Sequence, residues 1–350
     1  MIRVWSTVCA AGGIAYQAAF CSLAFCAIIL PARQANAQGS GIARAGVLLT
    51  LPADARSLGL GHAAAAASPD EWSTFHSPAQ LGAVRRASFG LATESYLAAT
   101  RLSAVAVALP LGRGTIGISA TLLDYGTIQE IATSVPGTDG IETGNTYSAK
   151  DNAVLVGYGV EAWRGIRLGA AAEFVSSQVA DLSGSGAAFS AGVARTMTNG
   201  WDFSGAVQHV GADITLGATR GSLPLTARIS AAAPARRMGN VDIRPMIEVR
   251  NVRGAGSAAA VAAEATWMGD RGAGLVFRGG YTIRSGVEDD HWPVSFGIGA
   301  TLGSFALDYA VQRFQTIDQV THRIGVRVAR STAQPVARPV ARPVARPALR

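Results

Sequence analysis

From about residue 86 onward, apolar and polar residues alternate in one segment of the chain after another. In residues 115–123 (TIGISATLL), the even-numbered positions hold isoleucine, alanine or leucine, whereas the odd-numbered positions up to 121 hold threonine, glycine or serine. The same two-residue period recurs in residues 165–174 (GIRLGAAAEF) and 275–284 (LVFRGGYTIR). Successive side chains of a β-strand point to opposite faces, so this period predicts strands. We count about fourteen such segments, which begin near residues 86, 101, 114, 146, 165, 185, 200, 222, 241, 256, 272, 292, 304 and 319.

The connections between these segments alternate in length. Residues 110–114 (PLGRG) and 161–165 (EAWRG) are tight turns, whereas residues 124–146 and 210–224 are long loops. Short turns at one end and long loops at the other are typical of a transmembrane antiparallel β-barrel, with the turns in the periplasm. An even number of strands would leave both ends of the chain in the periplasm. Trp163, Trp201 and Trp267 all fall at the tight-turn side, as an interfacial girdle requires.

A barrel of this size has an interior too wide to be filled by strand side chains alone, so its inner face can be polar. A soluble β-sandwich would instead turn its apolar face inward. The polar parity of the strands predicts these lumen-facing residues: Glu173, Arg244, Glu248, Arg278, Asp308, Arg323 and Arg327. They could tune an anion-preferring pore or form ion pairs that hold a plug in place, and the sequence leaves both possibilities open.

Four segments divide the chain. Residues 1–37 form a predicted signal peptide, with an uncharged run over residues 4–32 and the small residues Ala35 and Ala37 ahead of a cut before Gln38. A retained membrane anchor is the alternative. Residues 38–85 are rich in alanine and glycine and form a predicted plug, residues 86–330 the barrel, and residues 331–350 a disordered tail that repeats PVAR. This basic tail could contact anionic lipid headgroups or the cell wall, or it could be solvated without a partner.

The composition excludes several kinds of chemistry. The three cysteines, Cys9, Cys21 and Cys26, all lie in the predicted signal peptide, so the mature chain would have no disulfide, thiolate metal site or cysteine nucleophile. Two arginines of the signal and four of the tail account for most of the net charge of +7, and the remaining +1 gives no reason to expect nucleic-acid binding. The histidines are scattered, and no combination of nucleophile, base and acid is identifiable. We therefore predict no enzyme activity, no metal and no cofactor. The acidic run 288–290 (EDD) is predicted to be a solvated outer loop.

The stretch RSLGLGHA, residues 56–63, contains two glycines spaced as in a dinucleotide-binding turn. Such a turn follows a buried strand and opens a helix in a βαβ unit. The preceding LPADARSL is not a buried strand, and nothing downstream has the βαβ pattern. This excludes a nucleotide-binding interpretation of the two glycines.

Residues 43–81 (ARAGVLLTLPADARSLGLGHAAAAASPDEWSTFHSPAQL) resemble the opening signature of the PorV/PorQ family of outer-membrane proteins, which is related to the FadL-like fatty-acid transporters. The family pattern has a GARSLGMGGA core, an acidic stretch and then NPAGL. Residues 108–128 (ALPLGRGTIGISATLLDYGTI) are also similar to the family's second and third strands. The residues that match the plug motif are Arg56, Ser57, Gly59, Gly61, Asp70, Ser77, Pro78 and Ala79. Ser77 stands for the family's asparagine, and His62 for a second glycine.

The resemblance implies a barrel of about fourteen strands with residues 38–85 in or beneath the lumen, where Gly59 and Gly61 would permit tight backbone bends. It also implies a non-enzymatic role in a type IX-like secretion pathway. In that role the partners would be outer-membrane lipid, secreted proteins with C-terminal signal domains and a large translocon barrel. The alternative is a FadL-like channel for hydrophobic small molecules. An apolar pocket near the plug together with a lateral opening favours the channel. A sealed lumen together with an exposed apolar patch among loops 124–146 and 210–222 favours secretion.

Overall fold

The computed structural model describes residues 43–67, 69–97, 100–132, 141–269, 273–285, 292–315 and 318–330. The predicted signal peptide with its three cysteines, the acidic run 288–290 and the basic tail lie outside these ranges. Among the described residues, no helix has the length and apolar character needed to cross a bilayer.

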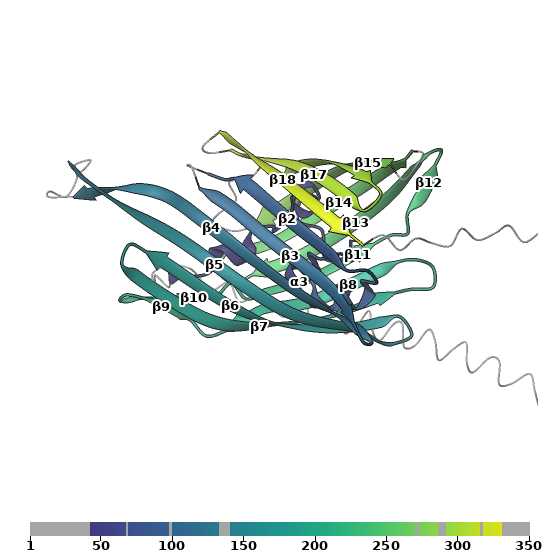
Figure 1. Cartoon of the computed structure of the whole chain (residues 1–350), viewed down its shortest axis with the longest axis horizontal. Helices are drawn as coiled ribbons and strands as arrows, with labels where there is room; N and C mark the ends of the chain where they lie inside the picture. The colour runs from purple at the N-terminus through teal and green to yellow at the C-terminus, as the bar shows by residue number, and fades with distance from the viewer. Residues whose placement is uncertain are drawn as a thin grey trace, which may run out of the picture.

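Fourteen antiparallel strands close into a barrel, which confirms the predicted fold class (Figure 1). The ladder runs in chain order from β2 to β8 and from β11 to β18, and it closes because β18 pairs with β2 and β11 pairs with both β8 and β13. One short extra strand, β12 (Arg236–Met238), continues the β11 edge along β13. The barrel strands are β2 (Ser88–Ser95), β3 (Arg101–Leu111), β4 (Gly114–Ala132), β5 (Ile141–Trp163), β6 (Ile166–Val179), β7 (Leu182–Thr196), β8 (Asp202–Gly211), β11 (Thr226–Ala232), β13 (Val241–Val252), β14 (Gly256–Met268), β15 (Ala273–Ser285), β16 (Val294–Leu302), β17 (Phe305–Phe314) and β18 (Gln319–Ala329).

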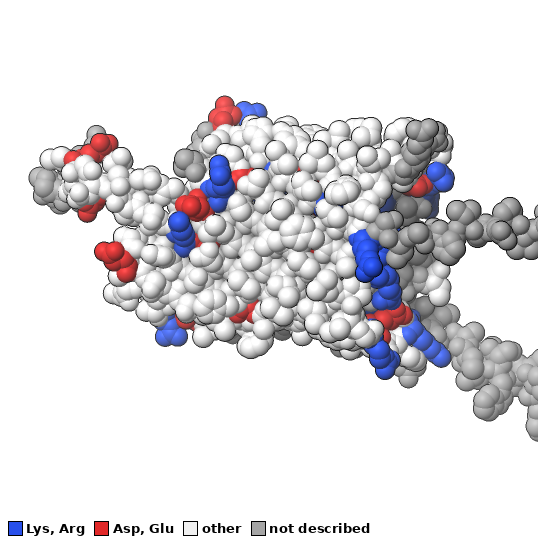
Figure 2. Space-filling model, viewed as in Figure 1, with Lys and Arg blue, Asp and Glu red and all other residues white. Residues whose placement is uncertain are grey.

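Burial follows the alternation read from the sequence. In β2 every second side chain is buried and every other one is exposed, and most other barrel strands follow the same alternation through their middle. The exposed face carries large apolar residues, among them Phe277, Phe296 and Leu307, each more than half exposed. In Figure 2 the band around the middle of the molecule is largely free of charged side chains, which gather at the two ends. An apolar band of this extent is incompatible with a water-exposed surface and matches the lipid-facing side of a membrane barrel.

The structure corrects the two predicted long loops. The predicted loop 124–146 is mostly strand, because the β4–β5 ladder continues outward through register shifts at Asp124/Thr127 and Gln129/Ile131. This hairpin projects beyond its neighbours at the left of Figure 1. The connection between β6 and β7 at the long-loop end is a two-residue turn, Ala180 and Asp181. The loop after β8 carries β9 (Ile214–Leu216) and β10 (Thr219–Ser222), which form a small sheet with β1 (Ala43–Arg44).

Residues 43–87, which we call the hatch, lie inside the barrel, where the ribbon coloured purple to blue runs between the strands in Figure 1. The hatch contains four short helical elements: η1 (Val47–Thr50), α2 (Ala55–Gly59), α3 (Ser73–His76) and η2 (Pro78–Ala83). It begins at Ala43, which pairs with Gly221 at the long-loop end. It leaves at the tight-turn end, where it enters β2. The described chain ends at the same tight-turn end, at Arg330, whose backbone N–H donates to Ala87. The predicted periplasmic location of both termini concerns residues outside the described ranges.

Candidate functional site

The hatch fits the barrel wall through small residues. A Cβ on Gly169 of β6 would overlap the carbonyl group of Pro78, so only glycine lets η2 lie this close to the strand. Gly61 follows α2 in the left-handed region, with φ of 59°. A side chain there would also come within 2.6 Å of the Thr282 hydroxyl, which donates a hydrogen bond of 2.9 Å to the Gly61 carbonyl. His62, which stands where the PorV/PorQ signature has a second glycine, also has a left-handed backbone, with φ of 71°.

The first part of the plug motif forms the α2 helix. Asp54 caps this helix by accepting a 3.0 Å hydrogen bond from the backbone N–H of Ser57. The Asp54 carboxylate also contacts the Nε2 atom of His76 at 2.9 Å. Burial alone would raise the pKa of Asp54, but the contacts from His76 and Ser57 outweigh burial and hold that pKa below its ordinary value. The cap therefore keeps its negative charge inside the hatch.

Arg56 projects from α2 into a buried ion-pair network. Its Nε and Nη2 atoms donate to the two carboxylate oxygens of Glu264 on β14, at 2.9 and 3.1 Å. Its Nη1 atom donates to Asp70 at 3.1 Å. Burial by itself would lower the pKa of Arg56, but the charges of Glu264 and Asp70 hold it above its ordinary value. Glu264 also accepts a 2.8 Å bond from Arg278 of β15, and Arg278 donates to Asp308 of β17 at 2.6 Å.

The network continues to the last strand. Arg327 of β18 lies 3.5 Å from Asp70 and 4.0 Å from Glu71. Glu71 is fully buried, and burial, reinforced by the neighbouring charge of Asp70, raises its pKa to about 7. We call Arg56, Asp70, Glu264, Arg278, Asp308 and Arg327 the polar seal. Two small cavities, each about large enough for a single water molecule, border it, and both are lined by Asp54, Arg56 and Asp70.

Further polar contacts tie other parts of the hatch to the wall. Arg323 of β18 pairs with Glu94 of β2 and donates to the carbonyl of Pro52. Glu248 of β13 accepts a 3.1 Å bond from the backbone of Ala65 and lies 3.3 Å from Arg228. Within the wall, Asp202 pairs with Arg167 and Arg244 at 2.9 Å each. Ser77 accepts a 2.9 Å bond from the Ser204 hydroxyl of β8. The structure thus places the seven polar residues singled out by strand parity on the inner face of the barrel, each in contact with a partner there.

A buried polar cluster occupies a bulge in the wall. His209 of β8 has φ of 61°, and its Nδ1 lies 2.7 Å from the Glu173 carboxylate. Ser190 donates to the other oxygen of Glu173, and the backbone N–H of His209 donates to the Ser190 hydroxyl at 3.2 Å. The Ser190 hydroxyl and the His209 imidazole thus both bind the carboxylate instead of each other, so the cluster lacks the side-chain contact between nucleophile and base that acyl transfer requires. Nor does any group of His, Cys, Asp or Glu within the described residues have the arrangement of a metal site.

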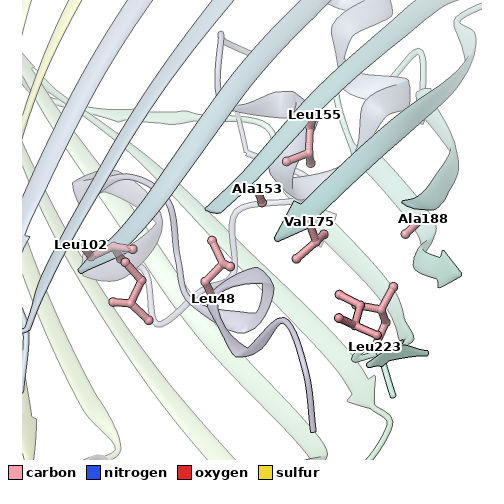
Figure 3. Close-up of a cluster of buried hydrophobic side chains, with 9 residues drawn as sticks. Leu48, Leu102, Ala153, Leu155, Val175, Ala188 and Leu223 are labelled. Atoms are coloured by element: carbon pink, nitrogen blue, oxygen red, sulfur yellow. The ribbon is translucent and has the colours of Figure 1, made fainter. Parts of the chain in front are cut away.

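The lumen is apolar toward the long-loop end. There, Leu48 of η1 is enclosed by side chains from β3 to β7 and from the loop after β8 (Figure 3). We call this the loop-side cluster, and its buried members are Leu48, Leu102, Leu123, Ala153, Leu155, Val175, Ala188, Ile214 and Leu223. Leu49, Leu51 and Phe75 of the hatch pack against it. This part of the lumen is filled by the hatch itself.

Sequence reasoning missed two of the polar residues that face the lumen, Glu264 and His209. Glu264 lies in a strand whose alanines occupy both faces (AAAVAAEATW, residues 258–267), so the alternation there is weak. Its being the only charge in that run is the signal that could have identified it. His209 was missed because strict alternation allows only one of two consecutive residues to face the lumen. The bulge at Phe189/Ala191 turns both Gln208 and His209 inward.

The solved structures that the barrel resembles are outer-membrane proteins of the FadL type. The toluene transporter TbuX of Ralstonia pickettii covers 79% of this chain and 98% of its own, at 13% identity and a TM-score of 0.53. The toluene transporter TodX of Pseudomonas putida covers 79% and 96%, at 10% identity and a TM-score of 0.55. A FadL homologue of Pseudomonas aeruginosa covers 79% and 97%, at 9% identity and a TM-score of 0.52.

No protein-family model matches the chain, and no curated protein is similar to its sequence at a significant level. At these identities the similarity establishes the fold alone, an antiparallel β-barrel that resembles those of outer-membrane proteins. These neighbours are transporters or channels and not enzymes. The implied PorV/PorQ membership and the type IX secretion role have no support among them, whereas the FadL-like alternative does.

Proposed function

We propose that this chain is a non-enzymatic outer-membrane channel for small apolar molecules, which enter at the loop-side cluster above the polar seal. The observation that carries the proposal is the division of the lumen. Its long-loop half is lined by leucine, isoleucine, valine and alanine, whereas its middle is closed by paired charges. Solutes that prefer the apolar long-loop half of the lumen over water are themselves apolar. The fold neighbours named as toluene transporters support the same class of solute.

Energetics favour weak, reversible occupancy of this region. A ring the size of a phenylalanine side chain gains roughly 2–3 kcal/mol on leaving water. The leucines of residues 47–51 already occupy the region, so a ligand must displace apolar contacts of similar worth. Binding is therefore coupled to movement of η1. Below it, the polar seal blocks ions and water as long as its charges stay paired.

The polar seal would also keep such a barrel from leaking ions. Arg278 and Arg56 are 2% and 7% exposed, and each contacts two carboxylates of the seal. An ion entering the lumen meets no unpaired partner there. An apolar molecule, by contrast, needs only to exchange places with other apolar groups. The barrel would thus be selective through the polarity of its lumen and not through a fixed pore diameter.

The test is equilibrium binding of fluorobenzene to the purified, membrane-reconstituted chain, followed by ¹⁹F line broadening. Leu155 is fully buried in the loop-side cluster, whereas Leu182 is 52% exposed at the start of β7, next to the outer turn between β6 and β7. We expect Leu155→Asn to abolish the broadening specific to the protein, and the matched Leu182→Asn to leave it unchanged. Equal broadening in both variants and in lipid alone would refute the proposed binding region.

A further inference from the structure

Exposed arginines form an arc at the tight-turn end of the barrel. They come from the segment before β2, the β3–β4 turn, the β5–β6 turn and the end of β18. These strands are neighbours in the ladder, so the arginines follow one continuous stretch of the rim. In Figure 2 basic side chains run down the right-hand edge of the barrel. We call Arg85, Arg86, Arg113, Arg164 and Arg330 the arginine arc.

The arc carries an excess of positive charge. Glu161 pairs with Arg85 at 2.7 Å, and within the described chain no acidic side chain forms an ion pair with any of the other four arginines. At the long-loop end, by contrast, several basic residues are paired with acidic ones. Lys150 lies 3.7 Å from Asp124, and Arg220 lies 2.9 Å from Asp213. The arc therefore groups four arginines that have no ion pair in the described chain on one stretch of the rim.

Apolar and aromatic side chains adjoin the arc on the membrane side. Trp163 is 62% exposed and lies under the Arg164 guanidinium, whose carbon is 4.7 Å from the ring centroid. Leu111 is 58% exposed, two residues from Arg113. Trp201 and Trp267, also exposed, lie at the same end of the barrel. A partner for the arc must therefore present anionic groups directly beside an apolar layer.

We propose that the arginine arc is a binding surface for the headgroups of anionic phospholipids in the periplasmic leaflet. A guanidinium forms paired hydrogen bonds with phosphate oxygens, and the acyl chains of such a lipid would lie against Trp163 and Leu111. A soluble polyanion of the cell wall would satisfy the arginines but would leave these apolar groups uncovered. The lipid satisfies both, which is why the structure favours it. This inference does not depend on what passes through the barrel.

The experiment uses the full mature chain in bilayers with spin-labelled phosphatidylglycerol or phosphatidylcholine as the probe. Electron paramagnetic resonance gives the relative association of each lipid with the barrel surface. One variant carries R86Q, R113Q, R164Q and R330Q. The matched control carries R101Q, R220Q, R253Q and R313Q, four exposed arginines of the long-loop end. Heat-dependent gel mobility and circular dichroism confirm that both variants fold.

We expect the wild type and the control to prefer phosphatidylglycerol by about threefold or more, and this preference to weaken at high salt. The arc variant should show no preference. An equal preference in the arc variant and the wild type would overturn the proposal. If the arc variant also lost binding to purified cell-wall sacculi, the arc would be assigned to a wall polymer instead.

Discussion

Removing the Glu264 carboxylate should release the hatch from the wall. In Glu264→Ala, the Arg56 and Arg278 guanidiniums lose a partner that now lies 2.8–2.9 Å away, although they stay 7% and 2% exposed. Leaving a buried charge uncompensated costs about 3–5 kcal/mol. Asp70 still pairs with Arg56 and Asp308 with Arg278, so the lower end of that range applies. About 3 kcal/mol corresponds to a roughly hundredfold shift toward the undocked hatch.

Amide hydrogen exchange of residues 55–67 measures this shift. The backbone N–H groups of Leu58 and Leu60 are bonded within α2 and exchange only when the hatch opens. We expect their exchange to accelerate about a hundredfold in Glu264→Ala, and ion conductance to appear in planar bilayers. The control is Glu161→Ala, which breaks the exposed pair with Arg85 and should change stability by about 1 kcal/mol or less.

Exchange in Glu264→Ala that is no faster than in Glu161→Ala would refute the polar seal as the closure of the lumen. If Glu264→Ala fails to assemble, Glu264→Gln keeps the shape and removes the charge. It should give a smaller acceleration in the same amides. Slow exchange in that variant as well would also rule out the polar seal as the closure.

Three further predictions concern the hatch and the loop-side cluster. Gly61→Ala places a Cβ 2.6 Å from the Thr282 hydroxyl at a residue whose φ is 59°, and it should weaken hatch docking by about 1–2 kcal/mol, measured as faster amide exchange. The control is Gly112→Ala, because Gly112 has φ of 60° but open space around it. Equal effects of the two substitutions on amide exchange would show that the contact with Thr282 does not matter. Burial raises the pKa of Glu71 from 4.5 to about 7, so the docked hatch binds the proton of the Glu71 carboxyl more tightly than the undocked hatch does. Docking should therefore be strongest below pH 4.5 and weaken by roughly 3 kcal/mol as the pH rises to 7. Asp54 does not contribute between pH 4.5 and 7, because its lowered pKa affects docking only below its ordinary value of 3.8. The docking free energy of Glu71→Gln should therefore not change with pH in this window. A pH dependence in Glu71→Gln equal to that of the wild type would rule out Glu71 as its source. Leu48→Ala should leave a cavity in the loop-side cluster and tighten fluorobenzene binding severalfold in the ¹⁹F assay, and weaker binding would show that Leu48 lines the site instead of filling it.

The barrel itself could be predicted because its strands alternate so regularly. Strands predicted to begin near 101, 114, 241, 256 and 319 begin at those residues, since apolar residues must face lipid at every second position. The same parity predicted that Arg278 and Asp308 face the lumen. What alternation cannot give is their pairing, because partners such as Arg56 and Glu264 are 208 residues apart and meet only through the closure of the barrel and the path of the hatch.

Other features escaped prediction for different physical reasons. The β4–β5 hairpin extends past the apolar band, where threonine, asparagine and glutamate occupy both faces and alternation disappears. Bulges such as the one at His209 shift the parity by one residue, so the next side chains change faces. The hatch has only short helical turns, and none is long enough to show an amphipathic period. Its position follows from glycine contacts and buried charges that become apparent only in three dimensions.

Passage of apolar solutes across the outer membrane through this barrel is the central proposal. The most direct measurement is the initial uptake rate of a radiolabelled small monoaromatic hydrocarbon by cells whose lipopolysaccharide-containing outer membrane carries the full chain. Cells with Leu155→Asn and with Leu182→Asn provide the comparison, together with a hydrophilic sugar of similar size as a second solute. We predict faster hydrocarbon uptake with the wild type and Leu182→Asn than with Leu155→Asn, and no change in sugar uptake. Hydrocarbon uptake that is the same in all three strains and in cells without the barrel would contradict the proposal.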